Sequence, residues 1–266
     1  MVGRRVRRID GLAVLAVLLL VTGTIFDRGI QAADKPSKQP QAADKTVVVL
    51  VHGFRQEAKD LQKLNDYMEE NSRFQVLQFE YPSRKITVDQ AAALLETFVR
   101  TRASDSQINL VGFSLGNLVI RRYLADMRKT NPRPTIGRVV MIAPPNHGAS
   151  WARKFRRGLG RLYGGPVVLQ IGADFDKLEP TLATPSDFGI IAGGMGDNVG
   201  FSKKTLPGDD DDYLKVETTK LSGAADFRLV KARHGELDDR QDVHELALHF
   251  LQNGSFGSEQ KRQRLR

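Results

Sequence analysis

The chain has 266 residues, a length that suits one large α/β domain or two small ones and that buries a substantial core without disulfides. It contains no cysteine, which excludes disulfide bonds and thiolate catalysis but fits either redox compartment. The net charge of +9 predicts attraction to anionic surfaces. Because no nucleic-acid-binding module is visible, we interpret this charge as membrane-surface or solubility charge and expect no nucleic-acid partner.

The first 33 residues are typical of an export signal. Arginines crowd residues 1–8, and an almost wholly apolar run follows from Gly11 to Phe26. This run is short for a bilayer-spanning helix, which needs about 20 residues. We predict either a signal peptide cleaved after Ala32 or Ala33, or an uncleaved membrane anchor. Both alternatives predict an exported protein, periplasmic or extracellular, or one held at the membrane.

The folded domain is expected over residues 46–254, after a polar linker at 34–45 and before a basic, disordered tail at 255–266. Within the domain, β-branched runs alternate with amphipathic stretches. The predicted strands are 46–51, 74–79, 107–111, 136–142, 188–192 and 227–231, and the predicted helices are 57–70, 88–102, 115–129 and 243–251. This alternation favours an α/β fold with a mostly parallel sheet and helices on both faces.

Residues 146–185 interrupt the alternation of strands and helices. They hold Trp151 and other large apolar side chains among several arginines and lysines. This composition predicts a small lid over the site. The alternative is a surface helix whose arginine stems cover apolar surface while their charged ends stay in water.

The most informative motif is Gly112-Phe113-Ser114-Leu115-Gly116, which reads G-x-S-x-G between a predicted strand and a predicted helix. Such a motif places the serine on a sharp strand-to-helix turn with its hydroxyl exposed above the sheet. The glycines are needed because the turn crowds the backbone. Ser114 is therefore the predicted nucleophile.

A serine nucleophile needs a base that takes the hydroxyl proton and an acid that orients the base. In sheet enzymes of this kind the chain order is nucleophile, acid, base. His234, directly after the last predicted strand, is the expected base. Of the other histidines, His52 ends the first strand, His147 is expected to line the site, and His244 and His249 are expected to face solvent from the last helix.

No metal site and no cofactor are predicted. The pair His244-Glu245 is followed by His249, and a five-residue spacing between the histidines is one too many for H-E-x-x-H on one helical face.

The end of the first strand, Val51-His52-Gly53-Phe54, is predicted to complete an oxyanion hole. The backbone N–H groups of Phe54 and Leu115 would point at the developing oxyanion, and His52 and Gly53 would hold the loop. The alternative is an ordinary turn at the end of a strand.

The acid must lie between the fifth strand and His234. Spacing alone does not choose among the candidates Asp197, Asp209, Asp210, Asp211, Asp212 and Asp226. The run of four aspartates could equally be a solvated turn or a weak calcium loop.

Together these motifs resemble the α/β-hydrolase superfamily, in particular compact lipase-like esterases related to bacterial triacylglycerol lipases and GPI inositol-deacylase-type proteins. The similarity covers Thr46 to Phe256. It is carried by Val51–Phe54, Gly112–Gly116, Ala143–Gly148, Pro207–Thr219 and Arg233–Gly235. The resemblance implies the α/β-hydrolase fold and a Ser-His-Asp triad.

The resemblance also selects an acid. The family's aspartate usually lies in an Asn-Asp-Gly-x-Val context ahead of a Val-Glu-Ser/Thr segment, and Val216–Thr219 sets that register here. The acid then falls on Asp211, with Asp197 as runner-up. This chain departs from the family pattern, because Asp210 and Asp212 stand where the asparagine and glycine are usual.

The leading hypothesis is an exported serine hydrolase that cleaves carboxylic esters through an acyl-enzyme, with a small-molecule ester or lipid as substrate. An acyltransferase that uses the same residues is the first alternative. The second is a non-catalytic binding protein of the same fold at an anionic membrane surface.

Overall fold

The computed structural model describes residues 46–104, 106–130, 134–156, 159–202 and 206–266. The predicted signal peptide or anchor at 1–33 and the linker at 34–45 lie outside these described residues. Within the described ranges, no helix is both long and apolar enough to cross a membrane.

A six-stranded sheet forms the centre of the described chain, with all neighbouring strands parallel and in the order β2-β1-β3-β4-β5-β6. The strands are β1 (Val47–Val51), β2 (Gln75–Phe79), β3 (Gln107–Phe113), β4 (Thr135–Ile142), β5 (Phe188–Gly194) and β6 (Asp226–Lys231). Each predicted strand is present, because β-branched and apolar runs suit strands buried on both faces.

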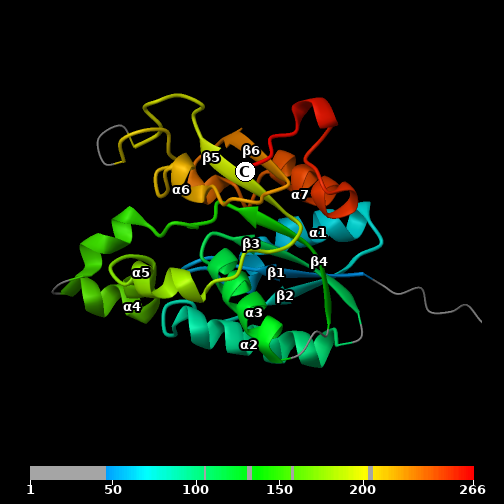
Figure 1. Ribbon diagram of the computed structural model, residues 1–266, viewed down its shortest axis with the longest axis horizontal. Helices are drawn as coiled ribbons and strands as arrows, with labels where there is room; N and C mark the ends of the chain where they lie inside the picture. The colour runs from blue at the N-terminus through cyan, green and yellow to red at the C-terminus, as the bar shows by residue number, and fades with distance from the viewer. Residues whose placement is uncertain (1–45, 105, 131–133, 157–158, 203–205) are drawn as a thin grey trace, which may run out of the picture. The chain divides into compact units, whose positions relative to one another are not determined.

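Helices cover both faces of this sheet (Figure 1). Helices α1 (Gln62–Asn71) and α7 (Gln241–Asn253) pack on one face, and α2 (Val88–Arg102) and α3 (Gly116–Thr130) pack on the other. Strand β1 shows why both faces are needed. Its residues alternate, so that Val49 joins the core under α2 and α3 while Leu50 joins the core under α1 and α7.

The connections reverse direction between β1 and β3, which are neighbours in the sheet. From β1 the chain moves outward to β2, whereas from β3 it moves the other way to β4. The crevice at the carboxyl ends of the strands beside such a reversal is the usual ligand site of open α/β sheets. Val51 pairs with Gly112, so the loops that follow β1 and β3 leave the sheet side by side.

Residues 146–185 fold into the short 3₁₀ helix Ser150–Arg156, then α4 (Leu159–Ile171) and α5 (Phe175–Leu178). Helix α4 is broken at Gly165, whose φ of 72° is not helical, and Pro166 follows it. Proline cannot donate a helical hydrogen bond, which accounts for the break. The short helix α6 (Val216–Thr219) lies between β5 and β6.

The C-terminal tail is ordered, so the expectation of disorder at 255–266 was wrong. The buried carboxylate of Asp226 accepts hydrogen bonds from the backbone N–H groups of Phe256 at 2.7 Å and Gln263 at 2.8 Å. The Phe256 side chain is itself buried, and the Leu265 N–H donates to the carbonyl of Ala224. The polar composition of the tail concealed these two apolar anchors and their buried acceptor.

Candidate active site

Ser114 sits on the turn between β3 and α3, with a φ of 49°. This left-handed conformation is strained for a residue with a side chain, and such strain is concentrated at functional sites. The glycines of the motif are required by close approach. A Cβ at Gly116 would lie 2.2 Å from the carbonyl oxygen of Val51, and one at Gly112 would lie 2.4 Å from the side-chain oxygen of Asn117.

Asn117 holds this turn in place, and the sequence reasoning missed it. Its Nδ2 donates to the carbonyls of Ser114 and Ile142, both at 3.0 Å. The Ser114 N–H also donates to Ile142 at 2.9 Å, so the turn is tied to the end of β4. An amide side chain directly after the G-x-S-x-G motif was the signal that could have revealed this role.

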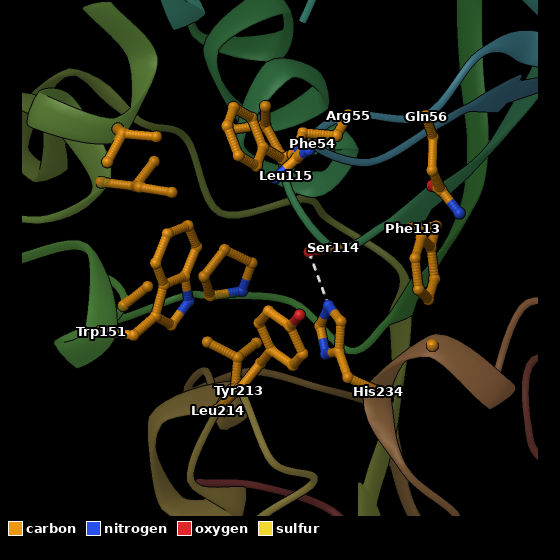
Figure 2. A pocket seen from close by; sticks show the side chains of 15 residues that line it. Phe54, Arg55, Gln56, Phe113, Ser114, Leu115, Trp151, Tyr213, Leu214 and His234 are labelled. Carbon is orange, nitrogen blue, oxygen red and sulfur yellow. Dashed lines mark hydrogen bonds between the residues drawn. The ribbon is translucent and has the colours of Figure 1, made fainter. Parts of the chain in front are cut away.

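His234 lies in the loop after β6 and faces the serine. Its Nε2 is 2.9 Å from Ser114 Oγ, as the dashed line in Figure 2 marks. The imidazole is packed between two aromatic rings, with Phe113 at 5.3 Å and Tyr213 at 5.2 Å between ring centroids. These contacts leave the ring little freedom to turn away from Ser114.

Asp211 approaches the other nitrogen of the same ring. Its Oδ2 is 2.7 Å from His234 Nδ1, and the residue is fully buried. The second oxygen, Oδ1, accepts N–H groups from Tyr213 at 3.0 Å and Leu214 at 2.7 Å, which fix the carboxylate plane. Because a carboxylate only accepts, Nδ1 carries the imidazole proton and Nε2 is left to accept from Ser114.

The runner-up acid, Asp197, lies on an exposed loop. Its Oδ1 accepts the N–H groups of Val199 and Gly200, each at 2.8 Å. The neighbours of Asp211 also have other partners: Asp209 accepts from the backbone of residues 195 and 196, and Asp212 contacts Arg233. The geometry thus brings Asp211, and not Asp197, to the histidine.

The backbone conformation of Asp212 shows how an aspartate can stand where the family pattern has glycine. Its φ is 81°, the left-handed region in which glycine is favoured. Aspartate is among the few other residues that enter this region readily. The backbone turn that glycine usually makes is therefore retained with an aspartate.

The two predicted oxyanion donors lie on the same cavity as Ser114. Phe54 and Leu115 both line it (Figure 2). Within the described part of the chain, neither backbone N–H donates to a protein acceptor. Two such amides beside a serine hydroxyl are what an oxyanion hole requires.

His52 is buried behind this loop and does not reach Ser114. Its Nδ1–H donates to the Gly53 carbonyl at 2.9 Å, and its Nε2 accepts the Tyr81 N–H at 3.3 Å. Burial lowers the pKa of His52, which favours the neutral ring that this pair of bonds requires. Both ring nitrogens are used by these bonds, so the residue braces the loop.

Two of the remaining histidine expectations were wrong. His147 does not line the cavity; it is exposed, with Nδ1 3.3 Å from Glu179. His244 does not face solvent, because it is buried on α7 with its Nε2–H donating to the Asp238 carbonyl at 2.7 Å. His249 is exposed as expected.

The cavity beside Ser114 has a volume of about 510 Å³ and mostly apolar walls. Residues 146–185 contribute much of one wall, namely Ala149, Trp151, Val168 and Ile171. The other wall residues include Pro145, Tyr213 and Leu214. No group of three or more metal-ligating side chains is found among the described residues.

Comparison with known proteins adds a partial family match. Residues 41–145 match the family model described as "Putative serine esterase (DUF676)". This span includes the β1 strand end and Ser114 but stops before Asp211 and His234. No curated protein sequence matches the chain.

Solved structures share the arrangement of the whole domain. The product of the lin2722 gene of Listeria innocua is 16% identical, with a TM-score of 0.57 over 84% of this chain and 99% of that one. The mature Bacillus licheniformis lipase BlEst2 is 16% identical, with a TM-score of 0.55 over 76% and 89%. The metagenomic carboxyl esterase MGS0156 is 15% identical, with a TM-score of 0.52 over 77% and 70%.

The chain has the α/β-hydrolase fold. The expected fold class and parallel sheet are therefore confirmed. The match of residues 41–145 to the putative serine esterase model supports an ester-hydrolysing enzyme.

Proposed function

We propose that this protein is a serine hydrolase that cleaves carboxylic esters of small molecules or lipids through an acyl-enzyme. One observation carries the proposal: Ser114 Oγ lies 2.9 Å from His234 Nε2, and the buried Asp211 holds the opposite nitrogen. The apolar cavity at this serine suits the acyl part of an ester.

The proposed reaction begins when Ser114 gives its proton to His234 Nε2 and attacks the acyl carbon. The amides of Phe54 and Leu115 stabilise the oxyanion, and Asp211 stabilises the imidazolium. His234 then returns the proton to the departing alcohol, which leaves an acyl-serine. Water attacks this ester while His234 takes its proton. Collapse of the second intermediate releases the carboxylic acid and restores the Ser114 hydroxyl.

A fluorophosphonate probe tests the proposal, because it reacts covalently with activated serines. We expect labelling of the wild-type chain and modification of the peptide that contains Ser114 by mass spectrometry. The same protein should release alcohol from a short-chain aryl ester. Absence of both labelling and hydrolysis would favour the non-catalytic binding protein. Transfer of the acyl group to an added alcohol in preference to water would favour the acyltransferase.

We also propose that the enzyme acts outside the cytoplasm, exported or anchored by residues 1–33. The support is the arginine-rich start followed by an apolar run. A membrane-impermeant form of the fluorophosphonate probe, applied to the culture medium and to spheroplasts that lack an outer barrier, should label Ser114. Labelling only after the cytoplasmic membrane is lysed would contradict this location.

Trp151 is expected to shape acyl-chain preference. Its ring lies 6.1 Å from that of Phe54 and 6.0 Å from that of Tyr213 between centroids, on the wall of the cavity that holds Ser114 (Figure 2). Replacement with alanine removes apolar contact area worth about 25 cal/mol per Å². We expect KM for esters with long acyl chains to rise by about 10-fold, with a smaller change for acetate esters.

Steady-state kinetics across a series of aryl esters would measure this effect of Trp151→Ala. Leu94→Ala is a suitable control, because Leu94 is 46% exposed on α2 and does not line the cavity. An equal change in KM for every chain length would show that Trp151 does not contact the acyl chain.

A further inference from the structure

A polar pair beside the site, formed by a half-buried glutamine and a buried aspartate, is not used by the proposed reaction. Gln56 lies in the loop after β1, and Asp238 lies between His234 and α7. Gln56 Nε2 donates to Asp238 Oδ2, a bond that joins segments 182 residues apart in the chain. Asp238 is only 6% exposed.

The partners of Gln56 determine how its side-chain amide is oriented. The Gly53 N–H lies 2.8 Å from Gln56 Oε1, and a backbone N–H needs an acceptor, so the oxygen must face Gly53. The NH₂ group is then directed at Asp238, whose carboxylate oxygen accepts from it. Each end of the amide thus has one complementary partner.

These contacts also affect the direction of the Phe54 backbone N–H, the predicted oxyanion donor. The Gly53–Phe54 peptide is planar and trans, so its C=O and its N–H point in opposite directions. The Gly53 carbonyl is held by His52 Nδ1–H at 2.9 Å and by the Gln56 backbone N–H at 3.4 Å. Holding that oxygen fixes the direction of the Phe54 N–H on the other side of the peptide.

The held peptide is close to the nucleophile. A Cβ at Gly53 would lie 3.2 Å from Ser114 Cβ and 2.9 Å from Gln56 Oε1. A rotation of this peptide would therefore change the position of the Phe54 N–H relative to the reacting carbon.

Burying the carboxylate of Asp238 destabilises the folded state, so its presence calls for a functional explanation. Burial raises the pKa of Asp238 to about 6, and the nearby Asp239 acts in the same direction, while the Gln56 bond and His234 oppose it. An apolar side chain of similar size would avoid the burial of a carboxylate. The Asp238 carboxylate accepts from Gln56, and among the described residues no ion pair to it is found, since the nearby Lys63 pairs with Asp239 instead.

We infer that Gln56 and Asp238 are positioning residues of the oxyanion hole. Asp238 orients the Gln56 side-chain amide, whose Oε1 accepts the Gly53 N–H, and the Gln56 backbone N–H donates to the Gly53 carbonyl. Gly53 is thus held on both sides, which keeps the Phe54 N–H that follows it directed toward the oxyanion. The pair thereby couples the oxyanion loop to the segment that carries His234. This inference rests on the proposed function, because an oxyanion forms only if Ser114 attacks an acyl group.

The test compares Gln56→Ala, Asp238→Ala and Asp238→Asn with wild type on one aryl ester and on its thionoester, whose sulfur is a poor oxyanion-hole acceptor. We expect both alanine variants to lower kcat for the ester by about 10- to 100-fold, a fraction of what a whole oxyanion donor contributes, with KM little changed. The thionoester rate should fall much less. Asp238→Asn should recover most of the loss, because its Oδ1 can accept from Gln56.

Two exposed neighbours provide matched controls. Gln62→Ala makes the same substitution at an exposed glutamine of α1. Asp239→Ala removes an exposed carboxylate, which pairs with Lys63 at 2.7 Å. Both controls should keep wild-type kcat. Equal losses on ester and thionoester, or wild-type kcat in Gln56→Ala, would overturn the inference. The proposed function fails separately, if wild type itself neither hydrolyses the ester nor reacts with the fluorophosphonate.

Discussion

Replacing Ser114 with alanine is expected to lower kcat for ester hydrolysis by about 10⁵- to 10⁶-fold and to abolish fluorophosphonate labelling. The variant loses the only atom that attacks the acyl carbon. It keeps the Cβ and the surrounding hydrogen bonds, because Ser114 contributes its backbone N–H and C=O to the turn through Ile142 and Asn117. Steady-state assays with a short-chain aryl ester and a gel-based labelling assay would measure both effects.

The matched control is Ser186→Ala, because Ser186 is exposed in the segment before β5. It should hydrolyse and label like wild type. The urea midpoint of Ser114→Ala should stay close to that of wild type, which would show that lost activity is not lost folding. Hydrolysis by Ser114→Ala at more than about one hundredth of the wild-type rate would exclude Ser114 as the nucleophile.

The fold was largely predictable because its strands are short apolar runs, and the central ones, β1, β3 and β5, are almost wholly buried. The run Val47–Val51 could be assigned to a central parallel strand without knowledge of its neighbours, since few other structures bury every residue of such a run. The Ser114 turn was predictable for a similar local reason: both glycines are needed, Gly116 against the Val51 backbone and Gly112 against Asn117.

Features that depend on contacts between distant segments could not be predicted. The tail was interpreted as disordered because the acceptor that orders it, Asp226, lies in another part of the chain. The solvent exposure predicted for His244 was wrong because the Asp238 carbonyl beneath α7 is not visible in a helical pattern. The bond between Gln56 and Asp238 has no sequence signal at all.

The identity of the acid was less predictable than the strands but more predictable than the contacts between distant segments. Four consecutive aspartates look alike in sequence, and only the family register favoured Asp211. In the fold they become different: Asp210 and Asp211 are fully buried, and only Asp211 is bonded to the His234 ring among the described residues. A carboxylate acquires a specific role from the donors around it, and those donors come from residues up to 23 positions away.

Replacing Asp211 with asparagine is expected to lower kcat by about 10⁴-fold, the loss that accompanies a histidine in the wrong tautomer. The asparagine Oδ1 can still accept the N–H groups of Tyr213 and Leu214, so its NH₂ must face His234. That NH₂ donates to Nδ1, which leaves the proton on Nε2. A protonated Nε2 cannot accept from Ser114, and the serine is no longer activated.

The pH dependence of kcat/KM and matched variants would test this explanation. Asp197→Asn should retain wild-type kinetics, because the Asp197 carboxylate accepts from the backbone of its own exposed loop. Asp211→Asn should fold with a urea midpoint near that of wild type and keep a low kcat/KM across the whole pH range in which wild type is active. A loss in Asp197→Asn larger than that in Asp211→Asn would move the acid to Asp197. If both variants kept full activity, the imidazole would need no carboxylate, and the proposed triad would reduce to Ser114 and His234.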